Sequence, residues 1–167
     1  MKRRAHADAG SATAKVAAPR RILVVEDEFQ TAQYVDEILR RMGIQVIGPA
    51  GSLRQAMILA ETEPLDAALL DVRLQPDVQL PYSDRVYPVA DVLRRRKIPF
   101  SFVTSSTGPE IDRFPRYPVL RKPFREDELQ SAVRRLLRRS LTAAPAASKR
   151  RGGRKAVGGE PIGSKQP

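Results

Sequence analysis

Short apolar runs alternate with longer amphipathic stretches between residues 21 and 140. The apolar runs are rich in Val, Ile, Leu and Phe, which is typical of strands buried on both faces of a sheet. They predict strands at 22–25, 45–48, 65–70, 100–104 and 119–121. Between them, apolar residues recur at helical spacing and predict helices at 32–42, 53–60, 89–97 and 126–139.

The order of these elements predicts the fold class. Strands that alternate with helices form βαβ units with a parallel sheet, and right-handed crossovers place helices on both of its faces. We therefore expect an α/β protein with a doubly wound, five-stranded sheet. The fourth crossover is the exception, because residues 105–117 include Gly108, Pro109 and Pro115, and proline interrupts helix interiors. A fourth helix is expected to be short or absent.

The two ends of the chain differ in composition from its middle. They are rich in Ala, Gly, Pro and basic side chains and lack periodicity, so they hold too little apolar area to offset the entropy of ordering. We expect a disordered basic arm at 1–20, one domain at 21–140 and a disordered basic tail at 141–167. The net charge of +11 divides into +4, +2 and +5 over these segments. Any contact with nucleic acid is therefore expected through the tails alone.

Composition excludes several kinds of site. The chain has no cysteine, which rules out disulfides, thiol catalysis and Cys-ligated zinc. Its single histidine, His6, lies in the N-terminal arm, so the domain has none for catalysis or metal binding. No apolar run is long enough for a membrane span, and none follows the basic residues 2–4 as in a signal peptide. We expect a cytoplasmic protein without membrane contact.

Polar side chains end four of the predicted strands or follow them directly. These side chains are Glu26 and Asp27, Asp71, Thr104, and Lys122. The carboxyl ends of parallel strands lie at one edge of a doubly wound sheet, where ligands bind. Clustered carboxylates repel one another unless a cation lies between them, and oxygen ligands alone favour Mg²⁺. With a lysine and a hydroxyl to contact phosphoryl oxygens, the set suits phosphoryl transfer to a carboxylate.

Each of these residues also has an ordinary structural interpretation. An acidic residue after a strand is often a loop residue or the N-cap of the next helix, and Asp71 alone could form a turn. Thr104 could be a β-branched strand residue, and Lys122 a solvated side chain. Their occurrence together, in order and at matching strand ends, favours the functional interpretation.

Four segments carry a family resemblance. They are ILVVEDE at 22–28, LLDV at 69–72, FVTS at 102–105 and LRKPF at 120–124. They are similar to the characteristic segments of response-regulator receiver domains, the CheY-like superfamily, and the resemblance covers about 120 of the 167 residues. It implies a flavodoxin-like fold with five parallel strands in the order 2-1-3-4-5.

The resemblance also implies a role for each acidic residue. Asp71 would accept a phosphoryl group from a histidine kinase or a phosphotransfer protein. Mg²⁺ would be bound by Asp27, Asp71 and the backbone carbonyl of Arg73, and Glu26 would assist through water. The chain would then be no enzyme for a separate substrate, but a phosphoacceptor that catalyses its own phosphorylation and dephosphorylation.

Further implied features lie on the last two strands. Thr104 and Lys122 would contact the phosphoryl group, and the Lys122–Pro123 bond would be cis. Two features depart from the family: the expected lack of a full fourth helix, and Val119, three residues before Lys122. Many receivers carry at that position an aromatic side chain that moves inward on activation, so the usual switch is not expected here.

Both departures resemble a subgroup of stand-alone receivers with Phe-Ala-Thr-Gly-x-Tyr at the end of the fourth strand. This chain has Phe-Val-Thr-Ser-Ser-Thr at 102–107, which keeps half of that motif. The Gln75–Arg85 segment is longer than usual beside the expected pocket. It could restrict kinase access or be a tolerated surface insertion. Residues 141–167 are too polar for an effector domain, so the output is expected through protein contact or the tails.

These observations favour a single-domain response regulator that relays or drains phosphate in a two-component pathway. The alternative is a nucleic-acid-associated regulator, in which basic side chains of the two tails give weak, salt-sensitive affinity; they are Arg150, Arg151, Arg154, Lys155, Arg3 and Arg4. A third interpretation is a receiver-like module that binds a partner without phosphorylation, because Glu26 replaces the more usual first Asp.

Overall fold

A computed structural model describes residues 18–75, 85–105 and 114–143, with side chains up to residue 140. The described residues form five strands and four helices. The strands are β1 (Arg21–Val25), β2 (Gln45–Ala50), β3 (Ala67–Asp71), β4 (Phe100–Thr104) and β5 (Val119–Arg121). The helices are α1 (Phe29–Arg41), α2 (Leu53–Thr62), α3 (Tyr87–Arg95) and α4 (Glu126–Ala143). No helix among these residues is long and apolar enough to cross a membrane.

All five strands are parallel and lie in the order β2-β1-β3-β4-β5. This order confirms the predicted doubly wound, flavodoxin-like sheet. β1, β3 and β4 are interior strands and are buried almost completely, as their continuous apolar runs predict. Their carboxyl ends carry the polar residues out of the core at one edge of the sheet.

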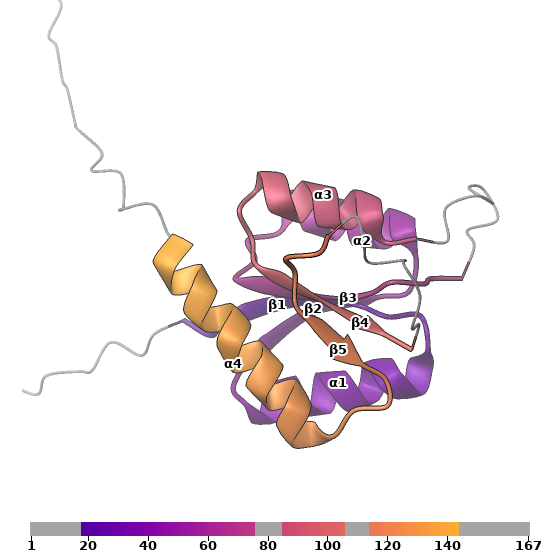
Figure 1. The fold of residues 1–167 in the computed structure, drawn as a ribbon, viewed down its shortest axis with the longest axis vertical. Coiled ribbons are helices and arrows are strands. Elements are labelled where there is room, and N and C mark those ends of the chain that lie inside the picture. Colours follow the sequence, from indigo (N-terminus) through magenta and orange to yellow (C-terminus); the bar gives the residue numbers. More distant parts are fainter. Residues whose placement is uncertain (1–17, 76–84, 106–113, 144–167) are drawn as a thin grey trace, which may run out of the picture.

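The helices cover the sheet in two layers (Figure 1). α1 and α4 lie on one face, and their apolar residues pack against Ile22, Val24 and Leu69. α2 and α3 lie on the other face and pack against Leu23, Leu70 and neighbouring side chains. The two faces of β1, β2, β3 and β4 therefore contribute to two separate hydrophobic clusters.

Two helix ends are stabilised by local features of the sequence. The Ser52 hydroxyl accepts a hydrogen bond from the backbone N–H of Gln55 at 3.2 Å and caps α2. Gly43 follows α1 with a φ of +73°, the left-handed conformation that glycine adopts easily at a helix end. α4 continues past the predicted Arg139 to Ala143, because the helical periodicity has no breaker before that residue.

β2 is longer than its predicted range. It continues through Gly48 and Pro49 to Ala50, and its register with β1 shifts between Leu23 and Val25. Gly48 has a φ of +100°, and a Cβ atom there would lie 2.8 Å from the carbonyl oxygen of Val24. A glycine is therefore required, and the shifted strand carries Ala50 alongside the end of β1.

Aromatic side chains lie in the connection that joins β4 to β5. In its described part, residues 114–118, this connection contains no helix. Phe114 is 3 % exposed and contacts Phe100 and Phe102, and Tyr117 stacks on Phe100 with ring centroids 4.2 Å apart. Phe114 belongs to the hydrophobic cluster beneath α2 and α3, and Tyr117 packs against that cluster. The prediction of a short or absent fourth helix agrees with the four helices described.

Three sequence predictions fall largely outside the described residues. The arm at 1–17 and the tail at 144–167 are not described, and of the Gln75–Arg85 segment only the two end residues are. The predictions about disorder of the tails and about kinase access stay predictions.

Candidate functional site

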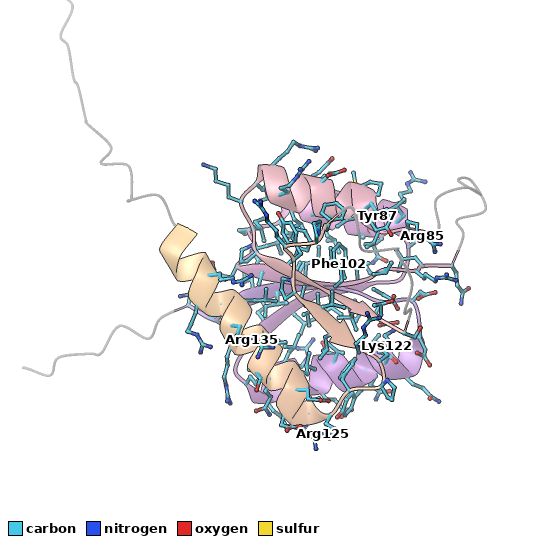
Figure 2. The ribbon with its side chains drawn as sticks, viewed as in Figure 1. Arg85, Tyr87, Phe102, Lys122, Arg125 and Arg135 are labelled. Atoms are coloured by element: carbon cyan, nitrogen blue, oxygen red, sulfur yellow. The ribbon has the colours of Figure 1, made fainter. Side chains whose placement is uncertain are left out.

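The structure brings Lys122 between two buried carboxylates at the carboxyl edge of the sheet. Its Nζ lies 2.6 Å from Oδ2 of Asp71 and 2.7 Å from Oε2 of Glu26. Glu26 and Asp71 are only 4 % and 8 % exposed. Figure 2 shows Lys122 at the tip of β5, where the strand ends converge. The predicted neighbourhood of Asp71, Glu26 and Lys122 is thus present in the structure.

Glu26, Asp27 and Asp71 form a carboxylate cluster suited to a divalent cation. One oxygen from each lies within 4.8 Å of the others. Oxygens around one Mg²⁺ ion at ~2.1 Å from the metal lie roughly 3–4 Å apart, so a small inward movement would suffice. The cluster offers hard oxygen donors and neither nitrogen nor sulfur, the set that Mg²⁺ prefers. The residues fit the predicted metal.

Burial makes the charge of Glu26 unfavourable. Desolvation, together with repulsion from Asp71, raises the pKa of Glu26 to about 7, although Lys122 and the Glu28 amide oppose this change. For Lys122, burial lowers the pKa, but its hydrogen bonds and attraction to Asp71 and Glu26 outweigh burial and raise it overall. Lys122 therefore favours its charged form, and a cation beside Glu26 would favour the charged form of that carboxyl as well.

Backbone N–H groups orient the three carboxylates. The Arg73 N–H donates to Oδ1 of Asp71 at 3.0 Å, and the Gln75 N–H donates to Oδ2 of Asp27 at 2.9 Å. Glu26 accepts more weakly from the Glu28 N–H, at 3.3 Å. These donors lie in the turns that follow β1 and β3, so the backbone of the turns adds to the contacts that Lys122 makes with Glu26 and Asp71.

Two interstrand hydrogen bonds position the backbone of the site. The Glu26 N–H donates to the Ala50 carbonyl at 3.0 Å, which requires the extended β2 described above. The Lys122 N–H donates to the Thr104 carbonyl at 2.9 Å and places the start of the Lys-Pro-Phe segment beside the end of β4. The Lys122–Pro123 bond is cis, as the family resemblance implies.

Thr104 and Arg73 lie beside this cluster with roles that remain predictions. Thr104 ends β4 and is 1 % exposed, and its backbone adjoins Lys122 as described. Arg73 contacts Asp71 through its N–H and pairs as an isolated bridge with Arg85.

The cluster opens into a cleft of about 590 Å³ between α1 and the Lys-Pro-Phe segment. Tyr34 and Phe124 form one wall, where their rings stack with centroids 6.2 Å apart. Gln30 and Thr31 line the cleft as well. None of these α1 residues was predicted at the site from the sequence. Gln30 and Thr31 lie four and three residues before Tyr34, so the three side chains share one face of the helix that follows Glu26 and Asp27. That spacing is a signal in the sequence that could have placed them beside the acidic residues.

Comparisons with known proteins extend these observations. No protein-family model matches the chain. The chain is 28 % identical over 124 residues to the transcriptional regulatory protein PdtaR of Mycobacterium tuberculosis. The match covers 72 % of this chain and 58 % of PdtaR, so the chain spans little more than half the length of that relative.

Solved structures give a closer match in length. SdrG of Pseudomonas melonis Fr1, solved in its BeF₃-activated conformation, is 34 % identical, with a TM-score of 0.56; the match covers 70 % of this chain and 95 % of SdrG. The receiver domain of the sensor histidine kinase PA1611 from Pseudomonas aeruginosa PAO1 was solved with magnesium in its active-site cleft. It is 28 % identical, with a TM-score of 0.58, over 72 % of this chain and 98 % of that domain.

The fold, the acidic cluster beside a strand-end lysine and these matches agree with one another. The chain belongs to the response-regulator receiver (CheY-like) family.

Proposed function

We propose that Asp71 accepts a phosphoryl group from a histidine kinase or a phosphotransfer protein, in a Mg²⁺-dependent reaction. The observation that carries this proposal is the position of Asp71, whose Oδ2 lies 2.6 Å from Lys122 Nζ at the base of an open acidic cleft. Asp71 is buried enough to be shielded, yet it lines the cleft through which a donor can reach it.

In the proposed step, a carboxylate oxygen of Asp71 attacks phosphorus. The bond between phosphorus and the donor nitrogen of phosphohistidine breaks, and the released imidazole nitrogen takes up a proton from solvent. An acyl phosphate forms on Asp71. Lys122 has three N–H donors, so it can hold Glu26 and still pair with a phosphoryl oxygen. The side chain thereby offsets charge that grows on the phosphoryl group.

Glu26, Asp27 and Asp71 would hold the Mg²⁺ ion, with the Arg73 carbonyl as the proposed backbone ligand. The bound ion would supply positive charge against the phosphoryl oxygens. The magnesium in the cleft of the PA1611 receiver domain supports this assignment. Thr104, buried at the end of β4, is proposed to donate its hydroxyl to the phosphoryl group.

We further propose that the chain acts as a cytoplasmic, stand-alone receiver that signals by protein contact or serves as a phosphate relay or sink. The absence of a helix in the described part of the β4–β5 connection and the exposed Val119 support a reduced switch, as in the Phe-Ala-Thr-Gly-x-Tyr subgroup. The alternative of a nucleic-acid-associated regulator depends on the tails, which lie outside the described residues.

Incubation with acetyl phosphate and Mg²⁺, followed by intact-mass measurement, tests the proposal. Wild type is expected to gain one phosphoryl group, and Asp71→Asn is expected to gain none while keeping its fold. Addition of excess chelator is expected to prevent the gain on wild type. No gain on wild type, or an equal gain on Asp71→Asn, would contradict the assignment of Asp71.

A further inference from the structure

β2 changes its register with β1 just before β1 ends. Leu23 pairs with Ile47, but Val25, two residues later, pairs with Ala50, which is three residues later. β2 therefore contains one extra residue over this stretch, as in a β-bulge. Ile47 and Ala50 accordingly pack into the same hydrophobic cluster, although a regular strand turns residues three apart to opposite faces. The extra residue thus re-aims the end of β2.

Gly48 is the residue that permits this shift. Its φ of +100° lies in a region that side chains other than glycine rarely adopt. A Cβ atom at Gly48 would lie 2.8 Å from the carbonyl oxygen of Val24 and 2.8 Å from the backbone nitrogen of Ala50. Both are backbone atoms of the paired strands, so neither can move aside as the end of a flexible side chain could. The shift therefore depends on glycine at this position.

The shifted end of β2 lies against the backbone of the acidic pair, Glu26 and Asp27. The Ala50 carbonyl accepts the Glu26 N–H at 3.0 Å, and Ala50 is fully buried, so water does not compete for this bond. A Cβ atom on Gly51 would lie 3.9 Å from the Cα atom of Asp27, so the chain passes close to the second acid as well. β2 thus supports the pair from the side opposite β3, the strand that ends in Asp71 (Figure 1).

Three carboxylates approach one cation only if the backbone holds them against their mutual repulsion. The oxygens of the cluster lie within 4.8 Å of one another, and around one Mg²⁺ ion they would lie roughly 3–4 Å apart. That inward step is small, and a site tolerates displacements of only about 0.5 Å in the groups that carry its ligands. The end of β1 is held by regular pairing on the β3 side and by the shifted strand on the β2 side.

We propose that the Gly48 bulge is a positioning element of the Mg²⁺ site, which fixes the backbone of the acidic pair at the distance from Asp71 at which one ion can bridge the carboxylates. This inference rests on the metal site of the proposed function. Gly48 has no side chain to offer an ion, so it is a positioning residue that acts through Glu26. Asp71 and Lys122 are carried by other strands, so loss of the bulge weakens metal binding and leaves the phosphoacceptor in place.

Titration calorimetry of the full chain with MgCl₂ tests this inference. Gly48→Ala is expected to bind Mg²⁺ about tenfold more weakly than wild type, because contacts behind a metal ligand commonly have an effect of that size. The comparison is made without any phosphoryl donor, so it does not depend on phosphorylation.

Two other glycine-to-alanine variants are matched controls. Gly43→Ala also forces alanine into the left-handed region, at a φ of +73°, but Gly43 follows α1 at the amino end of β2, and a Cβ there has open space among the described residues. Gly51→Ala lies beside the acidic pair, but its Cβ would make only ordinary contacts. Both controls are expected to keep Mg²⁺ affinity within about twofold of wild type.

The Mg²⁺ dependence of phosphorylation by acetyl phosphate separates positioning from general damage to the fold. For Gly48→Ala, the Mg²⁺ concentration that gives half the maximal rate is expected to rise about tenfold, while the rate at saturating Mg²⁺ stays within about threefold of wild type. A purely structural role would instead lower the saturated rate in proportion to the folded fraction, which thermal melting measures. Pro49→Gly replaces Gly48→Ala if that variant is unfolded. It loosens the same segment and is expected to weaken Mg²⁺ binding about threefold.

Three results would overturn the inference. Equal Mg²⁺ affinities of wild type and folded Gly48→Ala, or of wild type and Pro49→Gly where that variant is used, would do so and leave the proposed function intact. An equal loss of affinity in Gly43→Ala would mean that lowered stability, and not the position of the acidic pair, causes the effect. Failure of wild type to bind Mg²⁺ would overturn the proposed metal site together with this inference.

Discussion

The carboxyl ends of β4 and β5 and the connection between these two strands are held by different kinds of contact. At their carboxyl ends, Thr104 and Lys122 join a buried cluster in which charges are held by a few short contacts. In the connection between the strands, Phe114 and Tyr117 pack their rings on Phe100. The cluster depends on electrostatic positioning, and the connection depends on aromatic packing.

The largest expected effect comes from the aromatic side of this comparison. Phe114→Ala removes a ring that is 3 % exposed and is expected to lower the free energy of unfolding by about 3–5 kcal/mol. Urea denaturation measures this loss. At a temperature where the variant is still folded, acetyl phosphate is expected to phosphorylate it. Loss of phosphorylation in the folded variant would show that the two regions are coupled and would break the comparison.

Lys122→Met tests the electrostatic side. The substitution leaves Glu26 and Asp71 buried without their cation and is expected to cost about 2–4 kcal/mol of stability at pH 8 without metal. Phosphorylation by acetyl phosphate is expected to fall strongly. Because protonation relieves the carboxylates, the cost is expected to shrink at pH 5. A cost that does not change with pH would mean that packing of the lysine stem matters more than its charge.

Glu26→Gln tests the pH dependence of the same cluster. The folded-state pKa of Glu26 is about 7, above the ordinary value of 4.5. The folded state therefore binds more protons than the unfolded state between these values, and the Glu26 contribution to stability falls as pH rises through this window. Without metal, Glu26→Gln is expected to be as stable as wild type near pH 4.5 and more stable by about 1–3 kcal/mol above pH 7. Thermal unfolding across this pH range measures the difference.

Mg²⁺ supplies the control for the Glu26 prediction. The ion is expected to stabilise wild type more than Glu26→Gln at pH 8, because the variant has lost one carboxylate of the cluster. Equal stabilisation of both proteins would argue that Glu26 takes no part in metal binding.

The smallest expected effect concerns a backbone group. The Gln75 N–H donates to Asp27 at 2.9 Å, and Gln75→Pro removes that donor, whereas Gln75→Ala keeps it. Titration calorimetry is expected to show a Mg²⁺ affinity that is about three- to tenfold weaker for the proline variant and unchanged for the alanine variant. Equal affinities would mean that Asp27 is oriented by other contacts.

Local patterns in the sequence were sufficient for much of the fold. Strands at 100–104 and 119–121 occur as predicted, because their apolar runs are bounded by breakers on both sides. The acidic pair and Asp71 lie together as predicted, because parallel strands bring their carboxyl ends to one edge. Pro109 and Pro115 predicted a short or absent fourth helix, and the described part of that connection, residues 114–118, contains no helix.

Other features depend on contacts between residues far apart in the chain, and only the tertiary structure decided them. β2 runs past its predicted end because Gly48 shifts the register against β1, and that shift brings the Ala50 carbonyl to Glu26. The stacking of Tyr34 on Phe124 and of Tyr117 on Phe100 likewise has no local signal. The sequence of each segment determines its hydrophobic period, and with it the choice between helix and strand, as well as the residues at its ends. Which side chains meet across the sheet is set by packing, where shape and burial select one arrangement among many.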